Sequence, residues 1–97
     1  MITITLSFFA FLEEQFGRKQ SVSITEPIKI IELFRYFKTK NGEDSTSIFL
    51  SGTQLNNGFT ILLNGRNVQA LDELNTILEE DCEISFFPAI AGGLNLS

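Results

Sequence analysis

The sequence contains no histidine, a single cysteine and only two prolines. Without histidine, the chain cannot build a Ser–His or Cys–His catalytic pair or a histidine-ligated metal site. The lone Cys82 cannot form a disulfide within the chain, which fits a reducing compartment and a cytoplasmic location. No glycine-rich phosphate-binding motif follows any apparent strand. The chain is therefore not expected to act as an enzyme on its own, and no metal or cofactor is expected.

Basic residues are also scarce, because 7 bases stand against 12 acids and give a net charge of −5. Phosphate backbones attract a Lys/Arg surplus, so no nucleic-acid partner is expected. No apolar run is long enough to span a bilayer, so no membrane partner is expected either. Residues 6–12, "LSFFAFL", resemble the apolar part of a signal peptide, but no basic segment precedes them. Alternation with Thr3, Thr5 and Ser7 favours a strand there instead.

The first half of the chain predicts two strands and one helix. Residues 1–9 and 20–25 alternate apolar and polar residues with a period of two, which is typical of strands, and a link ending at Gly17 joins them. Residues 25–42 carry apolar side chains at helical spacing, with Pro27 in the first turn and Gly42 at the end. One amphipathic helix is therefore expected over this segment.

The second half predicts shorter elements. Residues 43–58 give few signals beyond an apolar anchor at 48–50. Residues 59–71 read as strand, turn at Asn64-Gly65 and short strand, and residues 71–82 as a link with a turn near Asp81. Residues 83–90 form the last strand, whose pairing should weaken at Pro88, because proline has no N–H to donate.

This order of elements predicts an α+β domain in which a mixed sheet of four to five strands packs on one main helix. The first and last strands should lie side by side in the centre of the sheet, which is the ubiquitin-like β-grasp arrangement. We expect the domain to span residues 1–89. Residues 90–97 are expected to form a flexible tail that contains Gly92 and Gly93.

The C-terminal half, "ILLNGRNVQALDELNTILEEDCEISFFPAIAGG", resembles MoaD/ThiS-type sulfur carriers, the small subunit of molybdopterin synthase and its relatives. The matching pieces are "NGR" after an apolar strand, "L..LNT.L" and "EISFFPAIAGG", and "FFAFLEEQFG" fits the first strand and following turn. Two features depart from the family pattern. Asp81-Cys82 stands where a Gly-Asp turn is common, and residues 94–97 follow the second glycine, where family carriers usually end.

The resemblance implies a carrier whose terminal glycine carboxylate is adenylated by a ubiquitin-activating-type enzyme and converted to a thiocarboxylate. The sulfur would then pass to a biosynthetic acceptor, for example through a synthase subunit in molybdopterin-like cofactor synthesis. In this chain the reacting residue is Gly93, supported by Gly92, and the bond from Gly93 to Leu94 must first be cut by a processing peptidase. The alternatives are a ubiquitin-like modifier joined to lysines through Gly93, or a β-grasp interaction module without tail chemistry.

An apolar docking patch is predicted on the sheet face away from the helix. Period-two alternation turns Phe9, Leu62 and Phe87 outward, and Pro88 and Ile90 extend the expected partner-binding set. The alternative is that residues 43–58 cover this face.

Two further features have a plain structural interpretation, and a third has two. Cys82 is interpreted as a half-buried strand residue rather than a sulfur-handling thiol, because no base lies near it in sequence. Arg66 is interpreted as a solvated turn residue rather than a partner contact. The acids of residues 72–83 are either a solvated surface or a steering surface for a basic partner, and both readings remain open.

Overall fold

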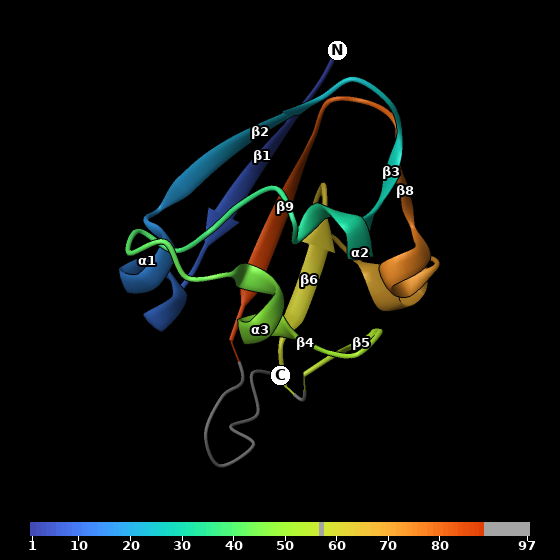
Figure 1. The fold of residues 1–97 in the computed structure, drawn as a ribbon. Helices are drawn as coiled ribbons and strands as arrows, with labels where there is room; N and C mark the ends of the chain where they lie inside the picture. The colour runs from blue at the N-terminus through green and yellow to red at the C-terminus, as the bar shows by residue number, and fades with distance from the viewer. Residues whose placement is uncertain (57, 89–97) are drawn as a thin grey trace.

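Five strands form one mixed sheet in the order β2-β1-β9-β6-β7 (Figure 1). The computed structural model describes residues 1–56 and 58–88. The strands are β1 (Ile2–Phe8), β2 (Lys19–Ile24), β6 (Thr60–Leu63), β7 (Arg66–Asn67) and β9 (Cys82–Phe87). β1 and β9 are parallel neighbours inside the sheet, and the other neighbouring pairs are antiparallel. The α+β class and the central pairing of the first and last strands are thus confirmed.

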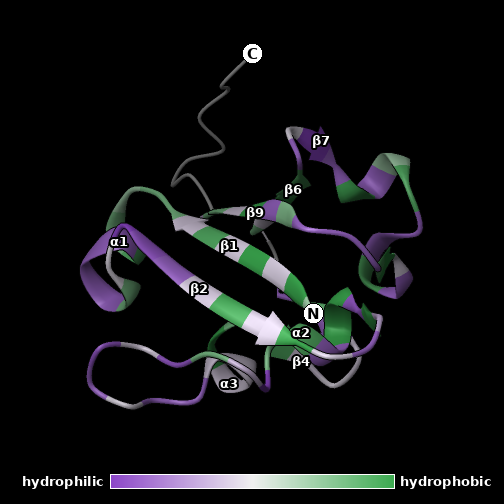
Figure 2. Cartoon of the chain, turned by 90° about the horizontal axis from the view of Figure 1, so that it is seen from above, coloured by the Kyte–Doolittle hydropathy of each residue, from purple (hydrophilic) through white to green (hydrophobic). Residues whose placement is uncertain are grey.

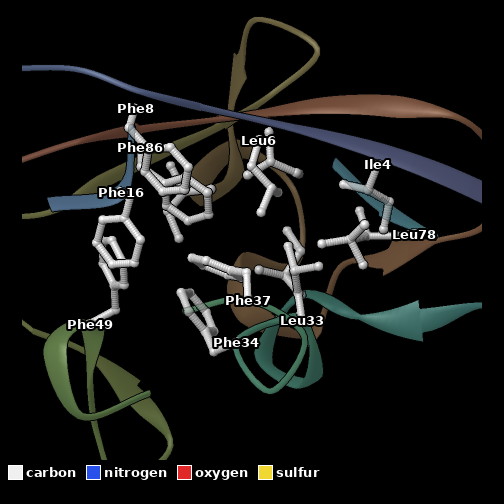
Figure 3. Close-up of a cluster of buried hydrophobic side chains, with 14 of the residues drawn as sticks. Ile4, Leu6, Phe8, Phe16, Leu33, Phe34, Phe37, Phe49, Leu78 and Phe86 are labelled. Carbon is white, nitrogen blue, oxygen red and sulfur yellow. The ribbon is translucent and has the colours of Figure 1, made fainter. Parts of the chain in front are cut away.

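One face of the sheet carries the hydrophobic core (Figure 3). Six phenylalanines expose at most 4% of their surface and pack together: Phe8, Phe16, Phe34, Phe37, Phe49 and Phe86. The ring of Phe86 is 0% exposed, and its centroid lies 5.1 Å from the centroids of both Phe8 and Phe49. Because aromatic rings bury large areas, this cluster joins the sheet to the segments that cover it.

The predicted single helix is wrong in its extent. The α-helix α2 covers only Ile30–Leu33, and it follows a short strand, β3 (Ile28–Lys29), that pairs with β8 (Ile77–Leu78). The β-branched Ile28 suits this strand, and the Glu32 carboxylate accepts a 2.8 Å hydrogen bond from the Lys29 N–H at the helix start. The apolar stripe that the spacing predicts is buried only in part. Phe34 and Phe37 of the stripe and the flanking Ile30 and Leu33 are buried, whereas Ile28 and Ile31 are half-buried.

The chain after α2 leaves the helix because its carbonyl groups find another partner. The hydroxyl oxygen of Ser45 lies 2.6 Å from the carbonyl oxygen of Phe34 and 2.7 Å from that of Phe37. Ser45 is fully buried at the start of α3 (Ser45–Phe49). A tertiary hydrogen bond therefore replaces the last turns that helical periodicity predicted.

The link between β1 and β2 contains an unpredicted helix, α1 (Phe11–Phe16). Its Leu12 and Phe16 are buried against the end of the sheet. Six residues give fewer than two helical turns, so no periodic pattern marks the helix in the sequence.

Residues 43–58 fold on the core side of the sheet. They form α3, β4 (Leu50–Ser51) and β5 (Gln54–Leu55), and β4 and β5 pair as a small hairpin. The Phe49 ring packs against Phe34 and Phe86, which belong to the core. The alternative in which this segment covers the outer face is therefore excluded for its described residues.

The hairpin of β6 and β7 is confirmed. Asn64 and Gly65 both have positive φ, 50° and 88°, as a type I′ turn requires. Beyond β7 the chain forms two short 3-10 helices, η1 (Val68–Ala70) and η2 (Glu73–Asn75), before β8 and β9.

A strained turn joins β1 to α1. Ala10 has φ 55° and ψ −136°, and the turn is closed by a 3.1 Å hydrogen bond from the Leu12 N–H to the Phe9 carbonyl. These angles resemble the first central position of a type II′ turn, which glycine normally occupies. The Cβ of an L-residue is disfavoured at such a positive φ by roughly 1–2 kcal/mol.

We expect Ala10→Gly to raise the free energy of unfolding by about 0.5–1 kcal/mol. Relief of the strained φ should exceed the entropy that glycine adds to the unfolded chain. Urea denaturation of the two proteins measures the change. Ala70→Gly in η1, where φ is not positive, is the matched control and should destabilise. If both changes destabilised the protein equally, the backbone at Ala10 would not be strained.

Candidate functional site

The last strand delivers the chain to one end of the sheet. β9 ends at Phe87, as the proline after it predicted, and Pro88 is buried there. Phe87 pairs with Thr60 on one side, and the Phe9 N–H donates to the Phe86 carbonyl at 3.2 Å on the other. Residues beyond 88 thus begin between the end of β1 and the start of β6. The predicted sites at Ile90, Gly92, Gly93 and Leu94, like the tail at 90–97, lie outside the described residues.

Two phenylalanines lie on the outer face beside this exit point. The rings of Phe9 and Phe87 stack with centroids 4.4 Å apart and planes 8° apart. Phe9 is 40% exposed and Phe87 is half-buried, whereas their chain neighbours Phe8 and Phe86 face the core. The structure therefore places both rings outward, as period-two alternation predicted.

Leu62 is also on the outer face, half-buried, and lies opposite Ser85 of β9. Phe11, which the sequence reading did not single out, is 48% exposed at the start of α1. The run "FFAF" reads as the end of a strand, so only the turn at Ala10 reveals that this ring is exposed. The apolar surface near the exit point thus has one exposed ring more than the sequence suggested.

The middle of the outer face is polar, which limits the apolar surface to one end. The Ser7 hydroxyl donates to the Glu83 carboxylate at 2.5 Å, and Lys19 Nζ lies 3.9 Å from the same carboxylate oxygen. These residues sit on β1, β9 and β2, next to one another in the sheet. Figure 2 shows how polar and apolar residues alternate along β1. The predicted patch is thus smaller than a whole apolar face.

The acidic segment has two members with structural roles. Asp81 accepts a 2.8 Å hydrogen bond from the Thr3 N–H, and Glu83 binds Ser7 as described. Asp72, Glu73, Glu79 and Glu80 are exposed, and so is Arg66 in β7. The solvated-surface interpretation fits most of this segment.

Cys82 begins β9 and is half-buried. Burial raises the pKa of its thiol, and the adjacent Asp81 carboxylate raises it further. A raised pKa lowers the thiolate fraction at neutral pH, which is opposite to what a reactive thiol needs. The structural interpretation of this residue agrees with its surroundings.

The described residues contain no metal-binding cluster and no groove with a catalytic arrangement of side chains. No group of three or more His, Cys, Asp or Glu side chains within them is arranged to hold a metal ion. A groove of about 610 Å³ lies between the β4–β5 hairpin and residues 68–75, with the apolar side chains Leu55, Phe59 and Leu74 in its lining. Its only titratable side chains are Lys29 and Glu73, so it lacks a catalytic arrangement. No helix among the described residues is long and apolar enough to cross a membrane.

A mixed sheet with parallel first and last strands, covered on one face by the segments that complete the core, is a ubiquitin-like β-grasp fold. The ThiS family model matches residues 6–93, and the chain belongs to the ThiS family. No curated protein sequence matches the chain.

Solved structures agree with this fold. The Haloferax volcanii HVO 2177 protein is 24% identical with a TM-score of 0.74, over 95% of this chain and 87% of that one. The small archaeal modifier protein 1 (SAMP1) of Methanosarcina acetivorans is 25% identical with a TM-score of 0.65, over 96% and 98%. A chain of the Amycolatopsis orientalis BexX/CysO complex is 18% identical with a TM-score of 0.64, over 93% and 99%.

The raised pKa of Cys82 makes a testable prediction. Alkylation of the native protein by iodoacetamide should be slower at pH 7.5 than that of the urea-unfolded chain, and its pH midpoint should be shifted upward. The reason is that only the thiolate reacts, and burial and Asp81 both disfavour it. Intact-protein mass measures the rate. If the native protein reacted faster than the unfolded chain, the pKa of Cys82 would not be raised by folding.

Proposed function

We propose that this protein is a sulfur carrier whose Gly93 carboxylate, once residues 94–97 are removed, is adenylated and converted to a thiocarboxylate. The sulfur then serves molybdopterin-like cofactor synthesis or a related biosynthetic pathway. The observation that carries the proposal is the family match, which covers residues 6–93 and ends at the second glycine. The position where β9 leaves the sheet, beside exposed rings, supports it.

The proposed chemistry takes place on the tail and in partner enzymes. The Gly93 carboxylate oxygen attacks the α-phosphate of ATP and pyrophosphate leaves; sulfide from a donor then attacks the acyl carbon and AMP leaves. Glycine has no Cβ, so Gly92 and Gly93 suit a narrow channel beside ATP. Six residues from 88 to 93 extend at most about 20 Å, which is enough to reach a partner's active site while the sheet docks outside.

The docking surface that we propose for the activating enzyme is the apolar end of the outer face. It comprises Phe9, Leu62 and Phe87, and Ile90 is expected to extend it. Pro88, which the sequence also assigned to this surface, is buried. Stacked rings at a sheet end present a rigid apolar surface that costs little ordering on binding. The same surface is proposed to receive the acceptor synthase subunit.

Processing is required because Gly93 lacks a free carboxylate in this sequence. Its carbonyl forms an amide with Leu94, and an amide oxygen is too weak a nucleophile to attack ATP. Residues 94–97 also carry side chains that a glycine-sized channel should reject. A peptidase that cuts after Gly93, of the zinc isopeptidase-like kind, would generate the reactive form.

A second candidate is conjugation of Gly93 to lysines of other proteins. The relative from Methanosarcina acetivorans, at 25% identity, is named a small archaeal modifier protein, which favours this possibility. The same activated glycine would then be attacked by an amine instead of sulfide. Isopeptide-linked adducts in the source cells would support the modifier, and a thiocarboxylate on the purified protein would support the carrier.

Phe87→Asp should weaken binding to the activating enzyme by roughly 10-fold to 150-fold while the fold survives. This corresponds to losing one phenylalanine side chain from an interface, about 1.5–3 kcal/mol. Calorimetric titration measures the affinity and circular dichroism the fold. Ser23→Asp, on the outer face of β2 far from Phe87, places the same charge elsewhere and should leave the affinity within about twofold. Equal losses from both changes would refute the patch.

The processing step predicts a difference between two forms of the chain. With the activating enzyme, ATP and a sulfide donor, the form ending at Gly93 should gain the mass of an oxygen-to-sulfur exchange. The form of residues 1–97 should gain none, because its Gly93 carbonyl is an amide. Gly93→Ala in the trimmed form should react at least about tenfold more slowly, because a Cβ enters the channel. Equal thiolation of both forms without cleavage would disprove the proposal that residues 94–97 must be removed first.

A further inference from the structure

The groove between the β4–β5 hairpin and residues 68–75 has a lining without net charge. Its charged side chains, Lys29 and Glu73, have opposite signs. The apolar part of the lining consists of Ile31, Leu55, Phe59, Val68 and Leu74. Leu55 and Phe59 are half-buried, so part of their surface is open to a ligand. An uncharged segment with apolar side chains therefore suits this groove better than a charged one.

Both walls of the groove are held in place by the core. On the hairpin side, the Asn56 N–H donates to the Phe49 carbonyl at 2.7 Å. On the other side, the Ile30 N–H donates to the Thr76 carbonyl at 2.9 Å. The Phe59 ring has its centroid 4.9 Å from that of Phe49. Because these contacts fix its walls, the groove is preformed, and a bound segment does not have to open it.

The described chain ends beside this groove. Phe87 of β9 pairs with Thr60 of β6, and the residues that adjoin this pair are Pro88 and Phe59. Phe59 belongs to the groove lining. In Figure 1, β9 ends at the same side of the molecule as β4 and β5. The segment that follows residue 88 therefore starts next to the groove.

Residues 89–97 have the reach and the sequence to enter the groove. Leu94 lies six residues beyond residue 88, so an extended chain places it up to about 20 Å away. Leu96 follows two positions later, and in an extended segment both side chains point to the same side. Gly92 and Gly93 have no Cβ, so the backbone before the leucines can turn back towards the protein. Residues 94–97 carry no charged side chain, which matches the groove.

The short connection makes weak binding sufficient. A link of a few residues gives an effective concentration on the order of millimolar. Burial of apolar side chains is favourable in proportion to the area removed from water. Two leucine side chains can therefore occupy the groove for most of the time, even if the same residues as a free peptide bind poorly.

We propose that Leu94 and Leu96 occupy this groove in the unprocessed chain and hold the segment before them against the protein. The docking itself does not depend on the proposed sulfur chemistry. Its consequence rests on the proposed function: the Gly93 end is withheld from the activating enzyme until residues 94–97 are removed. The flexible tail that the sequence predicts is then a property of the trimmed form.

NMR of the ¹⁵N- and ¹³C-labelled protein locates the extension. Between the chain of residues 1–97 and the form ending at Gly93, the largest signal shifts should occur at Leu55, Phe59 and Leu74. Nuclear Overhauser contacts should join the methyl groups of residues 94 and 96 to the Phe59 ring. The trimmed form keeps every described residue, so these differences report on the extension.

Substitutions within the extension test the two leucines. In the chain of residues 1–97, Leu94→Ser combined with Leu96→Ser should give the groove signals of the trimmed form. Asn95→Ser is the matched control and should keep the groove signals of the unaltered chain, because the side chain at 95 points away from the leucines. None of these changes touches a described residue, so misfolding of the domain does not confuse the result.

Protection from proteolysis gives a second measurement. Proteinase K should cut the bonds between residues 89 and 93 about fivefold or more slowly in the unaltered chain than in the variant with both leucines changed, since cleavage follows the undocked population. A fivefold difference corresponds to a tail that is docked about four-fifths of the time. Asn95→Ser should stay within about twofold of the unaltered chain. Intact-protein mass measures the rates.

Three outcomes would overturn the proposal. The first is unchanged signals at Leu55, Phe59 and Leu74 when the extension is removed or its leucines are replaced. The second is signal shifts centred on Phe9 and Phe87, which would place the extension on the outer face. The third is shifts that depend on protein concentration, which would make the tail of a second copy the occupant. Failure of thiolation in the trimmed form would leave the docking intact, so the two proposals fail separately.

Discussion

The parallel pairing of β1 with β9 is the interaction on which the rest of the structure depends. It places Leu6 and Phe8 beside Ile84 and Phe86, and the phenylalanines of the covering segments pack on this strip. The paired residues lie almost at opposite ends of the sequence, so the core cannot close before the last strand arrives. Two polar contacts reinforce this pairing: the Thr3 N–H donates to the carboxylate of Asp81, just before β9, and the Ser7 hydroxyl donates to the carboxylate of Glu83. The fold therefore needs nearly the whole chain up to Phe87.

That pairing also decides where the chain leaves the sheet. Because the two strands run in the same direction, β1 and β9 finish at the same edge, and Phe9 meets Phe87 there. The described chain ends at residue 88, next to the stacked rings of Phe9 and Phe87. The proposed carrier function would need three things from this fold: a rigid body, an apolar contact surface and a C-terminal segment that starts beside that surface.

Alternation and turn chemistry in the sequence were enough to predict β1, β2, β9, the hairpin at Asn64-Gly65 and the outward direction of Phe9 and Phe87. Those features depend on local sequence. The helix at residues 25–42 was wrong because its ends are decided elsewhere, by β8 at Ile28 and by Ser45 at Phe34. The polar centre at Ser7 and Glu83 was equally hidden, since it depends on the register between strands 76 positions apart. Helix α1 was too short to show a period. The predicted reactive glycines lie beyond the described residues, so their role continues to depend on sequence resemblance and the family match.

The strain at Ala10 belongs to the same end of the molecule. A non-glycine residue at φ 55° persists when burial on both sides fixes the turn more strongly than the strain opposes it. Here Phe8 before the turn and Leu12 after it are both buried almost completely. The turn thereby holds Phe9 against Phe87 and leaves Phe11 exposed, and the methyl group of Ala10 restricts the backbone more than glycine would. A glycine at this position would relieve the strain. It would also loosen the turn that orients the exposed rings of Phe9 and Phe11. Stability and the rigidity of the proposed docking surface therefore oppose each other at Ala10, and the sequence keeps the more rigid residue.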